Sequence, residues 1–200
     1  MQKILVLYYS RHGSVSSLAR EVGYGIETIE DCEAVFRTVP PVSSVCEATE
    51  PVIPGQGDVY ASAQDLVDCS GLVLGSPTRF GTIASPLKYF FDQAASEWLA
   101  GTLVDKPAGV FTSSSSMHGG QESTLLSMML PLIHHGMIMV GIPYPSTPIG
   151  RTNTGGTPYG ASHVGGPDSI KPIDNDEKTA ARVLGRRVAN CARLIAKQAL

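Results

Sequence analysis

The sequence predicts an α/β fold, a three-layer sandwich in which a five-stranded parallel sheet carries helices on both faces. Two observations support this prediction. Short, nearly continuous apolar runs alternate along the chain with longer segments whose apolar residues recur every three or four positions. Strands that are apolar on both faces are typical of parallel sheets, which lie buried between helices. Five strands favour the strand order 2-1-3-4-5 over a six-stranded dinucleotide-binding sheet.

The expected strands are the apolar runs of strand length. In chain order they lie at 3–9, 34–39, 71–75, 108–112 and 137–140. The first run stops abruptly at a short polar loop, and the third reads "GLVLG". Each run is followed or preceded by a segment of helical periodicity, which is why a parallel arrangement is expected.

The expected helices are the segments in which apolar residues share one face. They lie at 15–29, at 85–99, from about 121 to 135 and from 174 onward, with a shorter helix that ends at 66–67. The shared face of 85–99 carries Leu87, Phe91, Ala94 and Trp98. The last helix follows a capping-box pattern formed by Asp174 and Glu177.

Two segments rich in Pro, Gly and polar residues interrupt the alternation, at about 40–63 and at 141–172. The first is too long for an ordinary connection, which predicts a functional or interface loop. The second lies between an expected strand and an expected helix. We therefore expect both to be loop insertions within a single domain that spans residues 1–200.

Composition excludes several classes of function. The chain is 42% apolar and 16% charged, with a net charge of −3. This balance gives no sign of a nucleic-acid partner, and no apolar stretch is long enough for a membrane span. The first three residues lack the layout of a signal peptide, so we expect a cytoplasmic protein. The four cysteines form no CxxC pair and the histidines no HExxH pattern, so we expect free thiols and no metal site.

The loop after the first strand has the parts of a phosphate site. Ligands of such sheets bind beyond the carboxyl ends of the strands, and this loop comprises Ser10, Arg11, His12, Gly13, Ser14 and Val15. Gly13 allows a tight turn into the helix, whose first N–H groups and positive dipole end favour an anion. Ser10 and Ser14 add hydroxyl donors. The alternative is that Ser14 simply caps the helix.

The loops after the third and fourth strands suit a flat ring. One contains Pro77, Thr78, Arg79, Phe80 and Gly81, and the other contains Thr112, Ser113, Ser114, Ser115, Ser116 and Gly119. Phe80 beside Gly and Thr suits an aromatic ligand that also needs backbone hydrogen bonds, and small hydroxyl residues allow a ligand to approach the backbone. The alternatives are a β-turn with Phe80 packed inward and a flexible polar loop.

Five stretches of the sequence, in this order and spacing, resemble the WrbA family of flavodoxin-like NAD(P)H:quinone oxidoreductases. They are "LYYSRHG", "GSPTRFGT", "SSMHGGQE", "HHGM" and "GGTPYGASHVGG". The resemblance covers essentially all 200 residues, and "PTRFG" and "GGTPYGA" are its more specific parts. It implies a flavodoxin-like fold and an enzyme that uses FMN.

The resemblance also implies roles for the residues named above. Residues 10–15 would hold the FMN phosphate, residues 78–81 would flank the isoalloxazine ring, and residues 113–119 would bond to its pyrimidine side. Trp98 and His134 would line the pocket above the ring, with contributions from a neighbouring subunit of a homotetramer. His134 would contact the cofactor and act as the catalytic residue that donates to the quinone oxygen. The alternatives are that Trp98 packs in the core and that His134 or His135 caps a helix end.

The sequence departs from the family pattern at three places. His12 stands where a tyrosine linked to nicotinamide contact is usual, and we expect substrate binding at His12 and Trp98. Ser14 replaces the usual histidine. The loop after the fourth strand is one residue longer than in some members, with Met117 and His118 where small residues can stand.

The expected function is the FMN-dependent reduction of small-molecule quinones to hydroquinones by NADH or NADPH. One shared site predicts ping-pong exchange, in which the oxidised nicotinamide leaves before the quinone binds. The alternatives are a flavodoxin-type one-electron carrier and a regulatory protein that merely retains FMN.

Overall fold

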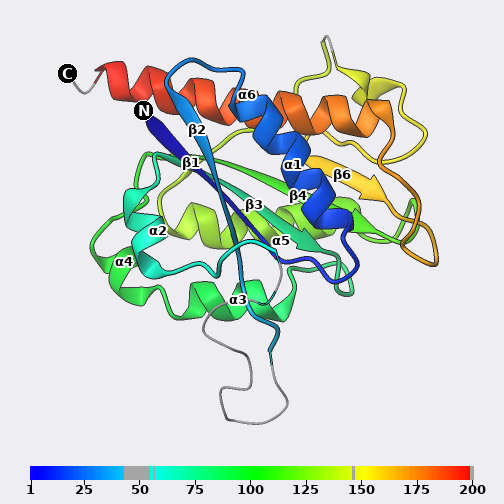
Figure 1. The fold of residues 1–200 in the computed structure, drawn as a ribbon, viewed down its shortest axis with the longest axis horizontal. Coiled ribbons are helices and arrows are strands. Elements are labelled where there is room, and N and C mark those ends of the chain that lie inside the picture. The colour runs from blue at the N-terminus through cyan, green and yellow to red at the C-terminus, as the bar shows by residue number, and fades with distance from the viewer. Residues whose placement is uncertain (43–54, 56, 146, 199–200) are drawn as a thin grey trace.

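A computed structural model describes residues 1–42, 55, 57–145 and 147–198. Its strands form one parallel sheet in the order β2-β1-β3-β4-β5, with a sixth strand that also pairs with β4 (Figure 1). The strands are β1 (Gln2–Tyr8), β2 (Cys32–Thr38), β3 (Gly71–Pro77), β4 (Pro107–Ser114), β5 (Ile138–Met139) and β6 (Ala161–Val164). The predicted strand order is confirmed.

The sixth strand corrects the prediction that 141–172 is a loop. β5 pairs only with the first two residues of β4, and β6 pairs with Phe111–Ser114 farther along the same strand. The two short strands therefore follow one another along the same edge of β4. The sequence of β6, "ASHV", has no apolar run, so its strand conformation depends on the pairing groups that β4 offers rather than on a local pattern.

Helices cover both faces of the sheet, as predicted. They are α1 (Ser14–Ile26), α2 (Ala63–Asp68), α3 (Ser85–Asp92), α4 (Ala95–Leu99), α5 (Gln121–His134) and α6 (Asn175–Gln198), with a 3-10 turn at Pro148–Gly150. α1 and α6 lie together on one face (Figure 1). Because side chains alternate along a strand, Ile4 and Val6 of β1 pack with α1 and α6, whereas Leu5 and Leu7 pack with α2, α3 and α5.

The helix expected at 85–99 is two helices. α3 ends after Asp92 and α4 begins at Ala95, because the backbone turns at Ala94, where φ is −89° and ψ is 31°. Leu87, Phe91 and Ala94 are buried as predicted, but the side chain of Trp98 is 51% exposed. The shared apolar face therefore ends before Trp98.

Much of the long polar segment expected at 40–63 lies outside the residues that the structure describes, at 43–54 and 56. The part that follows is tied to the body of the protein by Asp58, which accepts hydrogen bonds from Tyr8 Oη (2.7 Å) and from Arg20 (2.8 Å). Within the described ranges, no helix combines the length and apolar character needed to cross a bilayer.

Candidate functional site

A pocket opens at the carboxyl ends of β1, β3 and β4, the edge at which parallel sheets bind ligands. The residues that line it are Ser10, Arg11, His12, Ser14, Val15, Pro77, Thr78, Arg79, Ser113, Ser114, Ser115, Gly165 and Ser169. All but the last two were proposed from the sequence. The three polar loops therefore meet at one place, because the strands that precede them are neighbours in the sheet.

The N-terminus of α1 faces this pocket without a side-chain cap. Gly13 is the N-cap residue, in the left-handed conformation with φ 89°, and no side chain of the described ranges caps the first N–H groups. Ser14 is the first residue of the helix rather than its cap, so the alternative in which Ser14 caps the helix is wrong. The first turn contains no acidic residue. Its N–H groups and the positive end of the dipole are available to an anion.

Ser10 provides the test of whether the pocket fits a phosphate. Its Oγ is buried and has no hydrogen-bond partner among the described residues. A buried polar atom left without a partner is destabilising by about 1–3 kcal/mol, so such atoms are rare and need an explanation. A phosphate oxygen at the N-terminus of α1 would satisfy the hydroxyl. Arg11 and Arg79 line the pocket, and none of its lining residues in the described part of the chain carries a carboxylate, which also favours an anion.

The loop after β3 holds the side chain of Phe80 exposed, next to Arg79 of the pocket lining, although Phe80 is not itself a lining residue. Arg79 and Thr82 exchange backbone hydrogen bonds of 3.0 and 3.1 Å across a tight turn. Within that turn Phe80 has a positive φ of 53° and a fully exposed side chain. The predicted alternative had the turn but packed Phe80 inward, and that part is wrong. Positive φ is unfavourable for a bulky residue and is typical of functional sites.

Hydroxyl groups from two elements fix the floor of this loop. Thr78 Oγ1 accepts a hydrogen bond from Thr124 Oγ1 of α5 (2.7 Å), and Ser76 Oγ accepts one from the N–H of Ala84 (2.9 Å). Both bonds are buried or half-buried. These hydrogen bonds anchor the turn that carries Phe80, and the exposed Phe80 side chain is free to contact a ligand.

The loop after β4 begins later than expected, because β4 continues to Ser114. Thr112 is fully buried and its Oγ1 donates to the carbonyl of Ser76 (2.8 Å), so it joins β4 to β3 and does not line the pocket. Ser116 and Gly119 shape the turn instead: the carbonyl of Ser116 accepts from Ser114 Oγ (2.8 Å) and from the N–H of Gly119 (3.1 Å).

Two pocket residues, Gly165 and Ser169, were missed by the sequence reasoning. They follow β6, in the segment expected to be a loop. The stretch "GGTPYGASHVGG" that carries the family resemblance ends at this point, and its two final glycines were the available signal. They were not assigned because nothing in a local pattern says that β6 joins β4 and brings them to the pocket.

Trp98 and His134 do not line this pocket. Trp98 Nε1 donates to the carbonyl of His134 (2.8 Å), and both border a hollow at the C-terminal end of α5. The candidate pocket lies at the other end of this 14-residue helix, which is about 20 Å long at 1.5 Å per residue. The half-exposed Trp98 does not pack in the core, so that alternative is wrong. Within one chain, these two residues do not meet the pocket.

His135, beside His134, is the buried member of the pair. It is the C-cap residue of α5, and the centroid of its ring lies 5.8 Å from that of Phe91 in an edge-on arrangement. Its Nδ1 has no hydrogen-bond partner in the described part of the chain. Burial lowers the pKa of His135, so the ring is neutral near pH 7.

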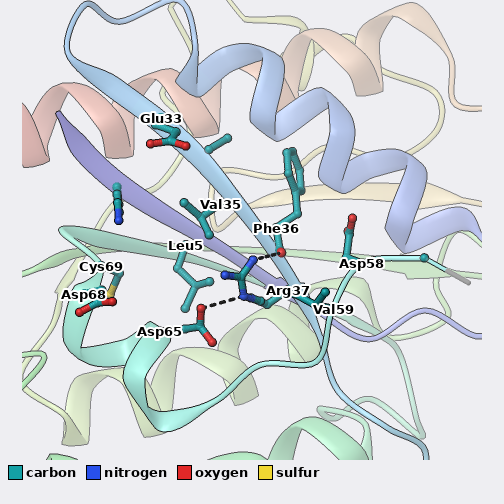
Figure 2. Close-up of a pocket in the computed structure, with 13 residues that line it drawn as sticks. Leu5, Glu33, Val35, Phe36, Arg37, Asp58, Val59, Asp65, Asp68 and Cys69 are labelled. Carbon is teal, nitrogen blue, oxygen red and sulfur yellow. Dashed lines mark hydrogen bonds and ion pairs between the residues drawn. The ribbon is translucent and has the colours of Figure 1, made fainter. Parts of the chain in front are cut away.

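A larger hollow of about 570 Å³ runs along β2 and is shown in Figure 2. Arg37 Nε pairs there with Asp65 at 2.7 Å, and Arg37 Nη1 donates to the carbonyl of Phe36 at 2.9 Å. The hollow lies away from the point where β1, β3 and β4 end, and its arginine is already paired. We therefore take the smaller pocket as the candidate functional site.

Comparisons with known proteins show the family of this chain. Residues 3–151 match the family model described as "NADPH-dependent FMN reductase". The chain belongs to this family. Relatives named "NAD(P)H dehydrogenase (quinone)" include one from Geobacter sulfurreducens, 40% identical over 94% of this chain and 97% of the relative, and one from Solidesulfovibrio magneticus, 38% identical over 95% and 97%.

Solved structures of similar fold include a WrbA-like flavodoxin from Agrobacterium tumefaciens and Flavodoxin 2 from Bacillus cereus. The first has a TM-score of 0.67 at 22% identity and covers 97% of this chain and 99% of its own. The second has a TM-score of 0.58 at 17% identity, with 96% and 99% covered. At these identities they establish the fold of this FMN reductase family member, which is flavodoxin-like, as predicted.

Proposed function

We propose that this protein is an FMN-dependent NAD(P)H:quinone oxidoreductase of the WrbA type. Membership of the FMN reductase family makes it an oxidoreductase that uses FMN and a reduced nicotinamide. The names of relatives at about 38% identity support a quinone as the acceptor. The observation that carries the proposal is the buried Ser10 hydroxyl, which has no partner among the described residues, beside the N-terminus of α1.

Each loop of the pocket has a role in this proposal. Residues 10–15 hold the phosphate through backbone N–H groups, hydroxyls and the charge of Arg11. Residues 77–81, with Phe80 at the rim, flank the ring, and Ser113, Ser114 and Ser115 bond to its polar edge. When bound, FMN supplies the hydride transfer from nicotinamide and the two-electron reduction of the quinone. Backbone N–H groups at this edge stabilise negative charge.

One pocket predicts that the two substrates use it in turn. In this proposal the nicotinamide and the quinone occupy the same space in the pocket, beside Phe80. Such sharing produces ping-pong kinetics. His12 borders the pocket and is in position to contact the nicotinamide nucleotide.

His134 and Trp98 require a neighbouring subunit in this proposal. They lie about the length of α5 away from the pocket of their own chain, so they can approach only the pocket of another copy. The exposed apolar side chains of Leu130 and Ile133 beside them support an assembly through this face. We propose a homotetramer in which His134 donates to the quinone oxygen. The reduced nicotinamide pool on which the reaction depends supports a cytoplasmic location.

The decisive experiment uses the purified protein with FMN. It should be yellow, lose its colour when NADH or NADPH is added without oxygen, and regain it when benzoquinone follows. Initial rates at several fixed quinone concentrations should give parallel double-reciprocal lines. A protein that binds no FMN would overturn the proposal. A protein that binds FMN but is reduced only by a partner protein would be a carrier, and one that turns over no small quinone would be a regulator.

A further inference from the structure

A buried ion pair lies behind the cofactor pocket and is not used by the proposed reaction. His163 of β6 is 1% exposed and Glu177 of α6 is 0% exposed, and His163 Nδ1 lies 2.8 Å from Glu177 Oε2. The other ring nitrogen, Nε2, lies 3.0 Å from the carbonyl oxygen of Lys171. His163 therefore joins three segments of the chain: β6, α6 and the loop after β6.

The ionisation of Glu177 follows from its hydrogen-bond partners. Burial raises the pKa of Glu177, but the hydrogen bonds from His163 and from the N–H groups of Asp174 and Gly155 outweigh it and bring the pKa to about 2. Glu177 is thus ionised. A carbonyl oxygen only accepts hydrogen bonds, so Nε2 of His163 carries a proton, and Nδ1 donates to the carboxylate. Each ring nitrogen of His163 therefore has a hydrogen-bond partner, the carboxylate of Glu177 or the carbonyl of Lys171.

The loop that His163 holds forms one wall of the cofactor pocket. Gly165 and Ser169 line the pocket, and the N–H of Lys171 donates to the carbonyl of Gly165 (3.0 Å), which closes residues 165–171 into a ring. Ser169 is held in this ring with a positive φ of 56°. A Cβ added to Gly165 would lie 3.4 Å from Ser14 Oγ and 3.6 Å from His163 Nε2. The loop therefore passes between His163 and the N-terminus of α1.

We propose that His163 is a positioning residue for the cofactor: through the Lys171 carbonyl it holds the loop 165–171 against the N-terminus of α1 and so sets the affinity for the phosphate end of FMN. This inference rests on the proposed placement of FMN in the pocket. His163 touches neither the pocket nor a ligand itself. Its effect is to prevent the loop from moving away when the phosphate binds, so that less conformational freedom is lost on binding.

Two substitutions separate the two bonds of His163. The side-chain amide nitrogen of Asn lies two bonds beyond Cβ, as Nδ1 does, whereas that of Gln lies three bonds beyond Cβ, as Nε2 does. His163→Asn therefore keeps a donor toward Glu177 and loses the link to Lys171. His163→Gln keeps a donor toward Lys171 and loses the link to Glu177. Each variant is the control for the other.

The test is titration of the apoproteins with FMN and with riboflavin, which lacks the phosphate, followed by flavin fluorescence. His163→Asn should weaken FMN binding about tenfold, the effect of one hydrogen bond, and leave riboflavin binding unchanged. His163→Gln should bind FMN like the wild type, although its melting temperature should fall further. Equal FMN affinity in His163→Asn and the wild type, or FMN affinities that follow melting temperature in both variants, would overturn the inference.

A second measurement needs no substitution. In the wild type, FMN should slow hydrogen exchange at the N–H groups of Gly165 and Lys171, and riboflavin should not. Exchange in 165–171 that FMN does not alter would also refute the role of this loop. A wild type that binds no FMN at all would instead overturn the proposed function, so the two failures are distinguishable.

Discussion

Replacing Ser10 with alanine should change cofactor affinity and apoprotein stability in opposite directions. In the apoprotein the buried Oγ has no partner among the described residues, and an unsatisfied buried polar atom is unfavourable by about 1–3 kcal/mol. Its removal should leave the free energy of unfolding unchanged or raise it by up to about 1 kcal/mol. With FMN bound, the same hydroxyl would donate to a phosphate, a bond that contributes about 1.5–3 kcal/mol. The Kd should therefore rise about 10–150-fold.

The assay measures both quantities on the same preparation. Urea unfolding of the apoprotein gives the stability, and quenching of flavin fluorescence gives the Kd for FMN and for riboflavin. Ser17→Ala is the matched control, because Ser17 lies on the exposed face of α1 one turn beyond the pocket. It should change neither Kd.

Three outcomes of this experiment would contradict the reasoning. FMN binding that is unchanged in Ser10→Ala would mean that the hydroxyl does not contact the cofactor. An equal loss of riboflavin affinity would place the contact away from the phosphate. An apoprotein destabilised by more than about 1 kcal/mol would mean that the hydroxyl has a partner in solution, such as a bound water.

Further predictions concern the core, the buried ion pair and the subunit contact. Gly75→Ala should lower the free energy of unfolding, measured in urea, by about 1–3 kcal/mol, because the new Cβ would lie within 2.6 Å of Phe111 Cε1 on the neighbouring strand. Gly55→Ala is the control and should have little effect, because no heavy atom lies within 4 Å of its new Cβ. The Glu177 carboxylate has a folded-state pKa of about 2 against an ordinary value of 4.5. Its contribution of about 3 kcal/mol to the free energy of unfolding is therefore complete above about pH 5 and lost as the pH falls toward 2. Urea unfolding measured from pH 6 to pH 2 should show this loss of stability, and Glu177→Gln should remove the pH dependence. His134→Ala should lower quinone turnover more than FMN affinity, and equal losses in steady-state and titration assays would refute its catalytic role.

The pocket at the carboxyl ends of β1, β3 and β4 was predictable because its parts are local. The loop that begins at Ser10 and the turn that carries Phe80 each follow an unmistakable apolar run, and parallel strands place their carboxyl ends at one edge. The residues that were misplaced depend on longer-range geometry. Thr112 was assigned to the pocket because a sequence does not show where a strand ends, and β4 turned out to include it.

The amino-acid sequence by itself determined the alternation of strands and helices, the order of the first five strands and the chemistry of the three loops, because these depend on side-chain periodicity and on residue type. Only the tertiary structure decided that Ala161–Val164 joins the edge of β4, that Gly165 and Ser169 complete the pocket, and that Trp98 lies at the far end of α5. It also decided that His163 meets Glu177 and the Lys171 carbonyl. The physical reason is that a short polar strand and a buried ion pair are stable only with partners distant in the chain, which no local pattern specifies.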